Sequence, residues 1–146
     1  MRLIFLFFIL VINVNSGFNQ SISISLPESA LEEDVICQEI AVIVDEMPTF
    51  PGGFDAMMNF ISSNIQYPEE ALNNGIEGRV VISFVINKKG EIIQPTIKRD
   101  IGGGCGQEGL RIVSLMPKWT AGKQSKESVC VSYNLPIKFS LTKNQK

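Results

Sequence analysis

The sequence predicts an α+β fold, a small three-stranded, antiparallel-type sheet with helices packed on one face. Apolar residues recur at helical spacing after Gly53, residues 78–101 read as two strands joined by a tight turn, and residues 129–141 alternate apolar and polar side chains. With 146 residues, 45% of them hydrophobic, and a net charge of -2, the chain has the composition of one modest domain. The absence of a basic excess disfavours nucleic acid as a partner.

The N-terminal residues predict a targeting segment followed by a leader. Arg2 precedes an unbroken apolar run over residues 3–12, and small and polar residues follow, as in a secretory signal peptide spanning residues 1–16. The run is short for a stable membrane span, and an uncleaved, marginal anchor is the alternative. Residues 17–44 are predicted to be a polar, partly disordered leader. The compact domain, residues 45–146, is expected to start beside a short β-rich run at residues 40–44.

Two helices are expected before the sheet. In the first, the apolar residues recur three or four positions apart, so they lie along one side of a helix. This pattern favours a face buried in the core over a methionine-rich ligand groove. The members of this stripe are Phe54, Met57, Met58, Ile61 and Ile65. The second helix is expected in "YPEEALNNG", where Pro68 suits the first turn, two glutamates complement the helix dipole and Gly75 can end the helix.

The sheet is expected to begin with a strand at Gly78. Its buried face is formed by Val80, Ile82, Phe84 and Ile86. The stretch "NKKG" predicts a hairpin turn in which Gly90 takes a positive φ. The partner strand, residues 91–101, contains Pro95, which has no amide hydrogen for a central ladder, so this strand should lie at an edge.

A third helix over residues 107–116, stopped by Pro117, leads to the last strand. A right-handed crossover through this helix lays the last strand beside the first, so the first strand is central and both outer strands carry a proline, Pro95 and Pro136. The face of the last strand that we expect to be buried consists of Val129, Val131, Tyr133, Leu135, Ile137, Phe139 and Leu141. The solvated face consists of Cys130, Ser132, Asn134, Lys138 and Ser140.

Three cysteines allow at most one internal bridge. Cys105 follows the second strand and Cys130 opens a strand parallel to it, so the two should lie at opposite ends of the sheet, too far apart for a disulfide. A bridge between Cys37 and Cys130 remains open, although we favour free thiols for all three. With no histidine in the chain, a zinc site is disfavoured.

The stretch "GCGQEG", residues 104–109, matches the dinucleotide-binding pattern G-x-G-x-x-G and follows a strand. That strand belongs to an antiparallel hairpin, however, so we favour a sharp turn made by Gly102, Gly103 and Gly104 over a cofactor site. No Ser-His or Cys-His nucleophile pair is available, because the chain has no histidine. The sequence therefore predicts neither an enzyme nor a cofactor.

Charged residues elsewhere suggest solvated surfaces rather than sites. The carboxylate pairs Glu69 with Glu70 and Glu32 with Glu33 lie in a helix first turn and in the polar leader. Three lysines surround Trp119 in "MPKWTAGKQSK" and could meet an acidic surface. The favoured interpretation is a solvated loop with the tryptophan turned inwards.

Five motifs, in order along residues 45–141, resemble the C-terminal domain of TonB, the energy transducer of outer-membrane receptors. They are "FPGG", "YPEEALNNGIEGRVVISFVINKKGEI", "IGGGC", "MPKWTAGKQ" and "YNLPIKFSL". The resemblance implies a split β-α-β fold in a periplasmic domain that docks on TonB-dependent outer-membrane receptors. In that family the receptor's Ton box adds as a strand beside the last β-strand, and an edge of this kind suits strand addition.

The resemblance also implies roles for individual residues. The partner-binding residues would be Val129, Val131, Ser132, Tyr133, Asn134, Leu135, Pro136 and Lys138. The architectural motif residues would be Tyr67, Pro68, Gly75, Gly78, Arg79, Pro117, Lys118 and Trp119. TonB itself has an N-terminal transmembrane helix and a long Pro-rich span, which this sequence does not show.

Three functions remain open on the sequence alone. The first is a TonB-type module associated with energised transmembrane transport, whose partners are the receptors and, if the N-terminus is anchored, inner-membrane motor proteins. The second is a soluble periplasmic module that binds another extended peptide or pairs with its own copy as a homodimer. The third is a cofactor-binding enzyme using the glycine motif, which we favour least.

Overall fold

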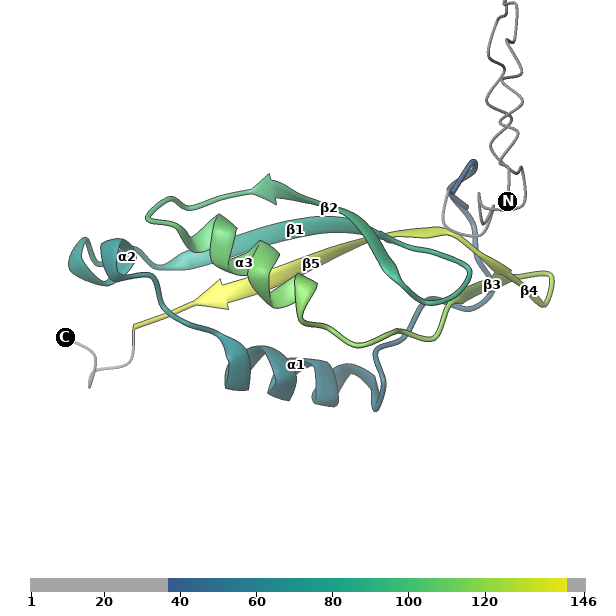
Figure 1. Ribbon diagram of the computed structural model, residues 1–146, viewed down its shortest axis with the longest axis horizontal. Helices are drawn as coiled ribbons and strands as arrows, with labels where there is room; N and C mark the ends of the chain where they lie inside the picture. The colour runs from purple at the N-terminus through teal and green to yellow at the C-terminus, as the bar shows by residue number, and fades with distance from the viewer. Residues whose placement is uncertain (1–36, 142–146) are drawn as a thin grey trace, which may run out of the picture. The chain divides into compact units, whose positions relative to one another are not determined.

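The computed structural model describes residues 37–141 (Figure 1). The predicted signal peptide and most of the predicted leader lie outside these residues. The helices are α1 (Gly53–Asn64), α2 (Glu69–Asn73) and α3 (Cys105–Ser114). The strands are β1 (Gly78–Ile86), β2 (Ile92–Arg99), β3 (Gly122–Gln124), β4 (Glu127–Val129) and β5 (Val131–Phe139). No helix among residues 37–141 is long and apolar enough to cross a membrane.

The main sheet has the order β2-β1-β5, with β1 antiparallel to both neighbours, which confirms the predicted topology (Figure 1). The β1–β5 ladder is regular from Gly78 opposite Phe139 to Ile86 opposite Val131. The β1–β2 ladder contains two register shifts, one of which spans Pro95 and Gln94, and Gln94 has a φ of 52°. Both prolines lie on outer strands, where a missing N–H group is tolerated.

Helix α3 lies against one face of the sheet, over β1 and β2 (Figure 1). Its approach is close, because a Cβ on Gly109 would lie 2.9 Å from the Ile82 side chain. The predicted buried face of β1 is confirmed, with Val80, Ile82 and Ile86 fully buried. The core continues through α1 and β5 and includes Phe50, Met57, Ile61, Phe84, Ile112, Trp119, Leu135, Ile137 and Phe139.

Helix α1 is present as predicted, but its apolar stripe is only partly buried. Met57 and Ile61 are buried, whereas Phe54 is 67% exposed and Met58 is 42% exposed. The expectation of one continuous core face is therefore wrong for Phe54 and Met58. Helix α1 lies beside β5 rather than across the sheet (Figure 1), and its buried residues are Met57 and Ile61.

Two predictions about local structure are wrong. Residues 40–44 form no strand, and this part of the chain makes only isolated bridges, such as Ile40 with Cys130 and Thr49 with Thr120. The stretch after Trp119 is a hairpin of β3 and β4 rather than an irregular loop. Its turn residues Ser125 and Lys126 both have positive φ without glycine, so the usual sequence signal of a hairpin is missing.

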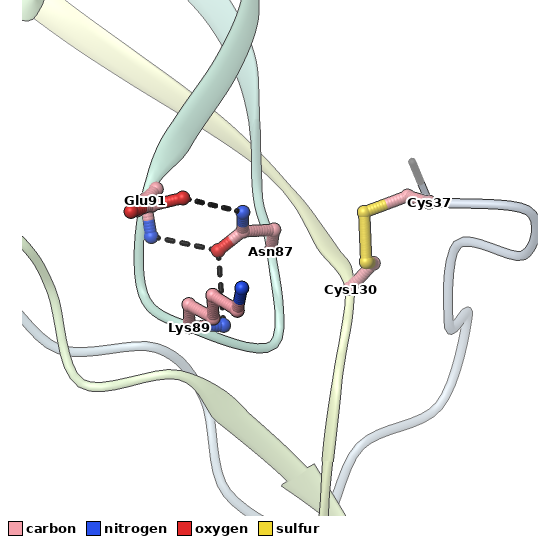
Figure 2. The surroundings of a disulfide bond; sticks show 5 residues. All are labelled: Cys37, Asn87, Lys89, Glu91 and Cys130. Atoms are coloured by element: carbon pink, nitrogen blue, oxygen red, sulfur yellow. Dashed lines mark hydrogen bonds between the residues drawn. A yellow bond between two sulfur atoms is a disulfide. The ribbon is translucent and has the colours of Figure 1, made fainter. Parts of the chain in front are cut away.

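The last strand and the cysteines also differ from expectation. The strand predicted over residues 129–141 is divided at Cys130 into β4 and β5, and β5 ends at Phe139. Cys37 and Cys130 form a disulfide with a Cα–Cα distance of 5.9 Å, so the favoured free thiols are wrong for this pair (Figure 2). Cys105 is free and buried, in agreement with its predicted separation from Cys130.

Candidate functional site

The outer edge of β5 has no strand beside it among residues 37–141. The register shows which backbone groups face this edge. The Asn87 N–H donates to the Glu91 carbonyl, and the Thr96 hydroxyl donates to the Ser83 carbonyl. The backbone N–H and carbonyl groups of odd-numbered residues on β1 and at its end therefore point towards β2. Even-numbered β1 residues consequently face β5, where Ile82 pairs with Leu135. The outward backbone groups of β5 therefore belong to Ser132, Asn134, Pro136 and Lys138.

Side chains of β5 alternate between the core and solvent. Val131, Leu135, Ile137 and Phe139 are buried, and Ser132, Asn134, Pro136 and Lys138 are exposed. Tyr133 is partly buried and stacks on Phe84 with ring centroids 5.6 Å apart. Of the residues predicted to bind a partner, only the even-numbered ones present both a backbone and a side chain to solvent. Val129 lies on β4, outside this edge.

A partly apolar cavity of about 250 Å³ lies between α1 and the second half of β5. It is lined by Met58, Ile61, Ser62, Ile65, Tyr67, Pro136, Ile137, Lys138, Phe139 and Ser140. Met58, which is 42% exposed, lines this cavity and is not part of the core cluster. The edge of β5 and the cavity are continuous, because Pro136 and Lys138 belong to both.

Tyr67, one of the predicted motif residues, supports the floor of this cavity. Its hydroxyl donates a hydrogen bond to the Ile76 carbonyl, and its ring meets Phe139 edge-on with centroids 5.6 Å apart. Burial raises the pKa of Tyr67, with smaller contributions from Cys105 and Glu77. The phenol therefore stays neutral and keeps its donor role.

The other predicted motif residues lie at the end of an element, in a turn or beside Trp119, with one exception. Pro68 occupies the N-cap position of α2, and Gly75 and Gly78 have φ values of 62° and 154°. Trp119 is buried between Phe50, Phe84 and Tyr133, next to Pro117 and to Lys118, whose Nζ lies 2.9 Å from Glu91. The exception is Arg79, which is exposed on β1 directly opposite Lys138.

The β1–β2 turn holds the far end of the sheet through Asn87, a buried polar residue that the sequence did not single out. Its Oδ1 accepts hydrogen bonds from the N–H groups of Lys89 and Glu91, and its Nδ2 donates to the Glu91 carboxylate (Figure 2). The Lys118 hydrogen bond, followed by that of Asn87, lowers the pKa of Glu91. These contacts fix the turn next to the Cys37–Cys130 disulfide (Figure 2).

An ion pair between buried Glu108 and partly exposed Arg111 fixes α3 against the segment that leads from α1 to α2. Glu108, 8% exposed, accepts hydrogen bonds from Arg111 at 2.7 Å and from the Gln66 N–H at 2.7 Å, and Arg111 also donates to the Asn64 carbonyl. Burial acts to raise the pKa of Glu108, but the hydrogen bonds and charge of Arg111 and the Gln66 N–H outweigh it and lower this pKa. In the sequence, the only sign of this ion pair is that Glu108 and Arg111 are three residues apart in a predicted helix.

The glycine motif forms the sharp turn that the sequence favoured. Gly102, Gly103 and Gly104 have φ values of 84°, 61° and 82°. The Asp100 carboxylate accepts hydrogen bonds from the N–H groups of Ile101 and Gly102, and a Cβ on Gly106 would lie 2.5 Å from it. The protein's own carboxylate thus lies at the start of α3, where a dinucleotide would place its phosphates. Residues 37–141 contain no group of acidic or cysteine side chains suited to a metal ion.

Comparison with known proteins identifies the family. The family described as "Gram-negative bacterial TonB protein C-terminal" matches residues 63–141. Two NMR solution structures of the Helicobacter pylori TonB C-terminal domain are similar, one at 28% identity over 60% of this chain and 78% of that chain with a TM-score of 0.46. The other, a shorter form, has 25% identity over 59% of this chain and 90% of that chain with a TM-score of 0.40. No curated protein matches significantly.

Members of this family are periplasmic, non-enzymatic domains that generally dock on TonB-dependent receptors. The matched residues contain α2, α3 and all five strands, including the outer edge of β5. The chain belongs to the TonB C-terminal domain family.

Proposed function

We propose that this chain docks in the periplasm on TonB-dependent outer-membrane receptors by accepting the receptor's Ton box as an added strand on β5. The observation that carries the proposal is the unpaired outer edge of β5, which offers hydrogen-bonding groups to an extended peptide. The cavity beside α1 adds a place for one or two apolar side chains of that peptide. Main-chain bonds then supply affinity, and the cavity supplies selectivity.

The edge also restricts the register of an added strand. Ser132, Asn134 and Lys138 can each present an N–H donor and a carbonyl acceptor, whereas Pro136 presents only a carbonyl. A peptide in the correct register places a group that needs no donor opposite Pro136. A strand shifted by one residue would turn its side chains to the wrong face, away from the cavity.

The route from the leader to this edge supports a role in energised transport. Cys37 is joined to Cys130, the residue immediately before β5. Tension applied to the chain before Cys37 therefore reaches the docking strand through a covalent bond, without first loading the exposed residues that follow Cys37. A disulfide also agrees with an oxidising periplasmic location.

Backbone amide shifts measured by NMR test the docking. The full chain, isotope-labelled and kept in solution by a mild non-ionic detergent, is titrated with Ton-box peptides of the host's receptors. We expect saturable shifts centred on residues 131–140 and on Met58. Asn134→Pro removes an outward donor and should weaken binding at least about tenfold, since one hydrogen bond is lost and its partner is left unpaired. Pro136→Ala, the matched control, restores a donor and should not weaken binding.

Absence of shifts at millimolar peptide, with the spectrum of a folded domain, would rule out receptor docking. The alternative, a module that binds its own copy through the same edge, predicts that amides of β5 shift with protein concentration in the absence of peptide. Equal binding by the Asn134→Pro and Pro136→Ala variants would show that the peptide lies elsewhere.

A further inference from the structure

Basic side chains gather on the face of the sheet opposite α3, at the end where β1 begins. Arg79 on β1 lies directly opposite Lys138 on β5, and Arg99 on β2 pairs with Val81, two residues along β1. All three basic residues are exposed. Lys98 reaches the same face, because its Nζ lies 3.3 Å from the Asn134 Oδ1 across β1. We call Arg79, Lys98, Arg99 and Lys138 the basic cluster.

The basic cluster lacks carboxylate partners among residues 37–141. None of its members forms an ion pair there, although Lys118, Lys123 and Arg111 each have an acidic partner. The chain as a whole carries a net charge of -2, so the cluster is a local reversal of the overall balance. Uncompensated positive charge on an acidic protein favours an anionic partner at this place.

The pairing of Arg79 with Lys138 is the least expected feature of the cluster. Because Arg79 faces β2 and Lys138 faces outwards, they form a non-hydrogen-bonded pair, in which Cα atoms approach to about 4.5 Å. Like charges directly opposite one another destabilise a sheet. An arrangement that costs stability in the free protein is relieved when an anion joins it.

The docking edge brings such an anion to the right position. Lys138 presents its backbone to the outer edge of β5 and also lines the cavity beside α1. In an added strand, the residue opposite Lys138 has its Cβ about 5 Å from that of Lys138, on the same face of the sheet. A carboxylate on that residue lies within reach of both Lys138 and Arg79.

We propose, on the basis of the proposed function, that the segment docked on β5 carries an aspartate or glutamate at the position paired with Lys138. The basic cluster recognises this carboxylate and so sets the register and partner preference of the edge. The apolar cavity and the cation pair act on opposite faces of the same strand. The preferred partner is thus an extended segment that is apolar towards α1 and acidic towards Arg79.

Paired peptides test the inference. Each Ton-box peptide of the host's receptors is compared with a version in which every aspartate and glutamate is replaced by its amide, using the NMR titration of the full chain. We expect the amide version to bind about fivefold more weakly at low salt, as one exposed carboxylate between two cations would give. The difference should vanish in an Arg79→Gln, Lys138→Gln double variant. It should persist in the Lys88→Gln control, since Lys88 lies at the other end of β1.

A charge exchange strengthens the test. Lys138→Glu should weaken the native peptide and favour a peptide whose acidic residue is replaced by lysine. If both peptide versions bind equally while residues 131–140 still shift, the carboxylate inference fails and strand addition stands. If neither version binds, the proposed function itself fails.

Acidic residues of the chain itself compete with a docked segment for the basic cluster. Glu28, Glu32, Glu33 and Asp34 lie outside the described residues but close in sequence to Cys37. If the double variant shifts amide signals of residues 28–34 in the absence of peptide, the basic cluster serves this segment and the inference about the partner is overturned.

Discussion

Reduction of the Cys37–Cys130 disulfide should strongly destabilise the domain. The bridge joins residues separated by 93 positions, so in the unfolded chain it closes a loop that spans most of the described sequence. The chain-entropy relation for a loop of this length gives a stabilisation of about 4.6 kcal/mol. For a domain of roughly 100 residues, this corresponds to a fall in Tm of about 20 °C.

The assay is thermal unfolding with and without reductant, followed by far-UV circular dichroism and by the fluorescence of Trp119. Trp119 is the single tryptophan and is buried against Phe50 and Phe84, so its emission reports on core packing. A variant combining Cys37→Ser with Cys130→Ala is the control, because reductant should not lower its Tm further. Cys105 should contribute nothing, since burial, followed by the charges of Asp100 and Glu108, raises the pKa of its thiol.

A fall of less than about 5 °C on reduction would refute this reasoning. It would mean that the unfolded chain already holds the two ends together, or that the bond strains the native fold enough to cancel its entropic gain. Hydrogen exchange separates local from global effects. The Ala41 N–H, which donates to the Cys130 carbonyl at 2.9 Å, should exchange faster after reduction even where the domain remains folded.

Two further substitutions test the fold. Glu108→Gln should lower the free energy of unfolding at neutral pH by about 1.5 kcal/mol, measured in urea, because it removes the charged acceptor of Arg111, whose own side chain is 36% exposed and stays partly hydrated. Folding lowers the pKa of Glu108, so the stability that its carboxylate contributes is present above the ordinary carboxyl pKa and is lost as pH falls through the folded pKa. The Glu108→Gln variant should therefore lose less stability on acidification than the unmodified protein. An equally steep loss in both proteins would contradict this. Gly90→Ala should cost at least about 3 kcal/mol, because φ is +82° and the added Cβ would lie 1.9 Å from the Trp119 carbonyl. Gly75→Ala, with φ +62° and no atom within 4 Å, should cost only about 1 kcal/mol, and equal losses would show that the contact with Trp119 is unimportant.

Much of the fold was predictable because its signals are local. The alternation on β1, the turn glycine Gly90 and the two strand prolines specify a hairpin with one edge strand and a final outer strand. The partner residues on β5 were predicted from a family resemblance. In the structure, the odd-numbered ones point their side chains towards the core and the even-numbered ones are exposed at the outer edge. Ser125 and Lys126 show the opposite case, since their positive φ values depend on the β3–β4 pairing and leave no mark in the sequence.

By itself, the sequence determined β1, β2, most of β5 and the buried faces of β1 and β5, because alternating hydrophobicity and strand prolines are properties of a few neighbouring residues. The tertiary structure decided which cysteines meet and which carboxylate pairs with Arg111. It also decided that Phe54 and Met58 stay exposed and that Arg79 lies opposite Lys138. The disulfide and the Arg79–Lys138 pair join residues far apart along the chain. The degree of burial of Glu108, Phe54 and Met58 depends on neighbours from other elements. All of these features therefore exist only after the elements have packed.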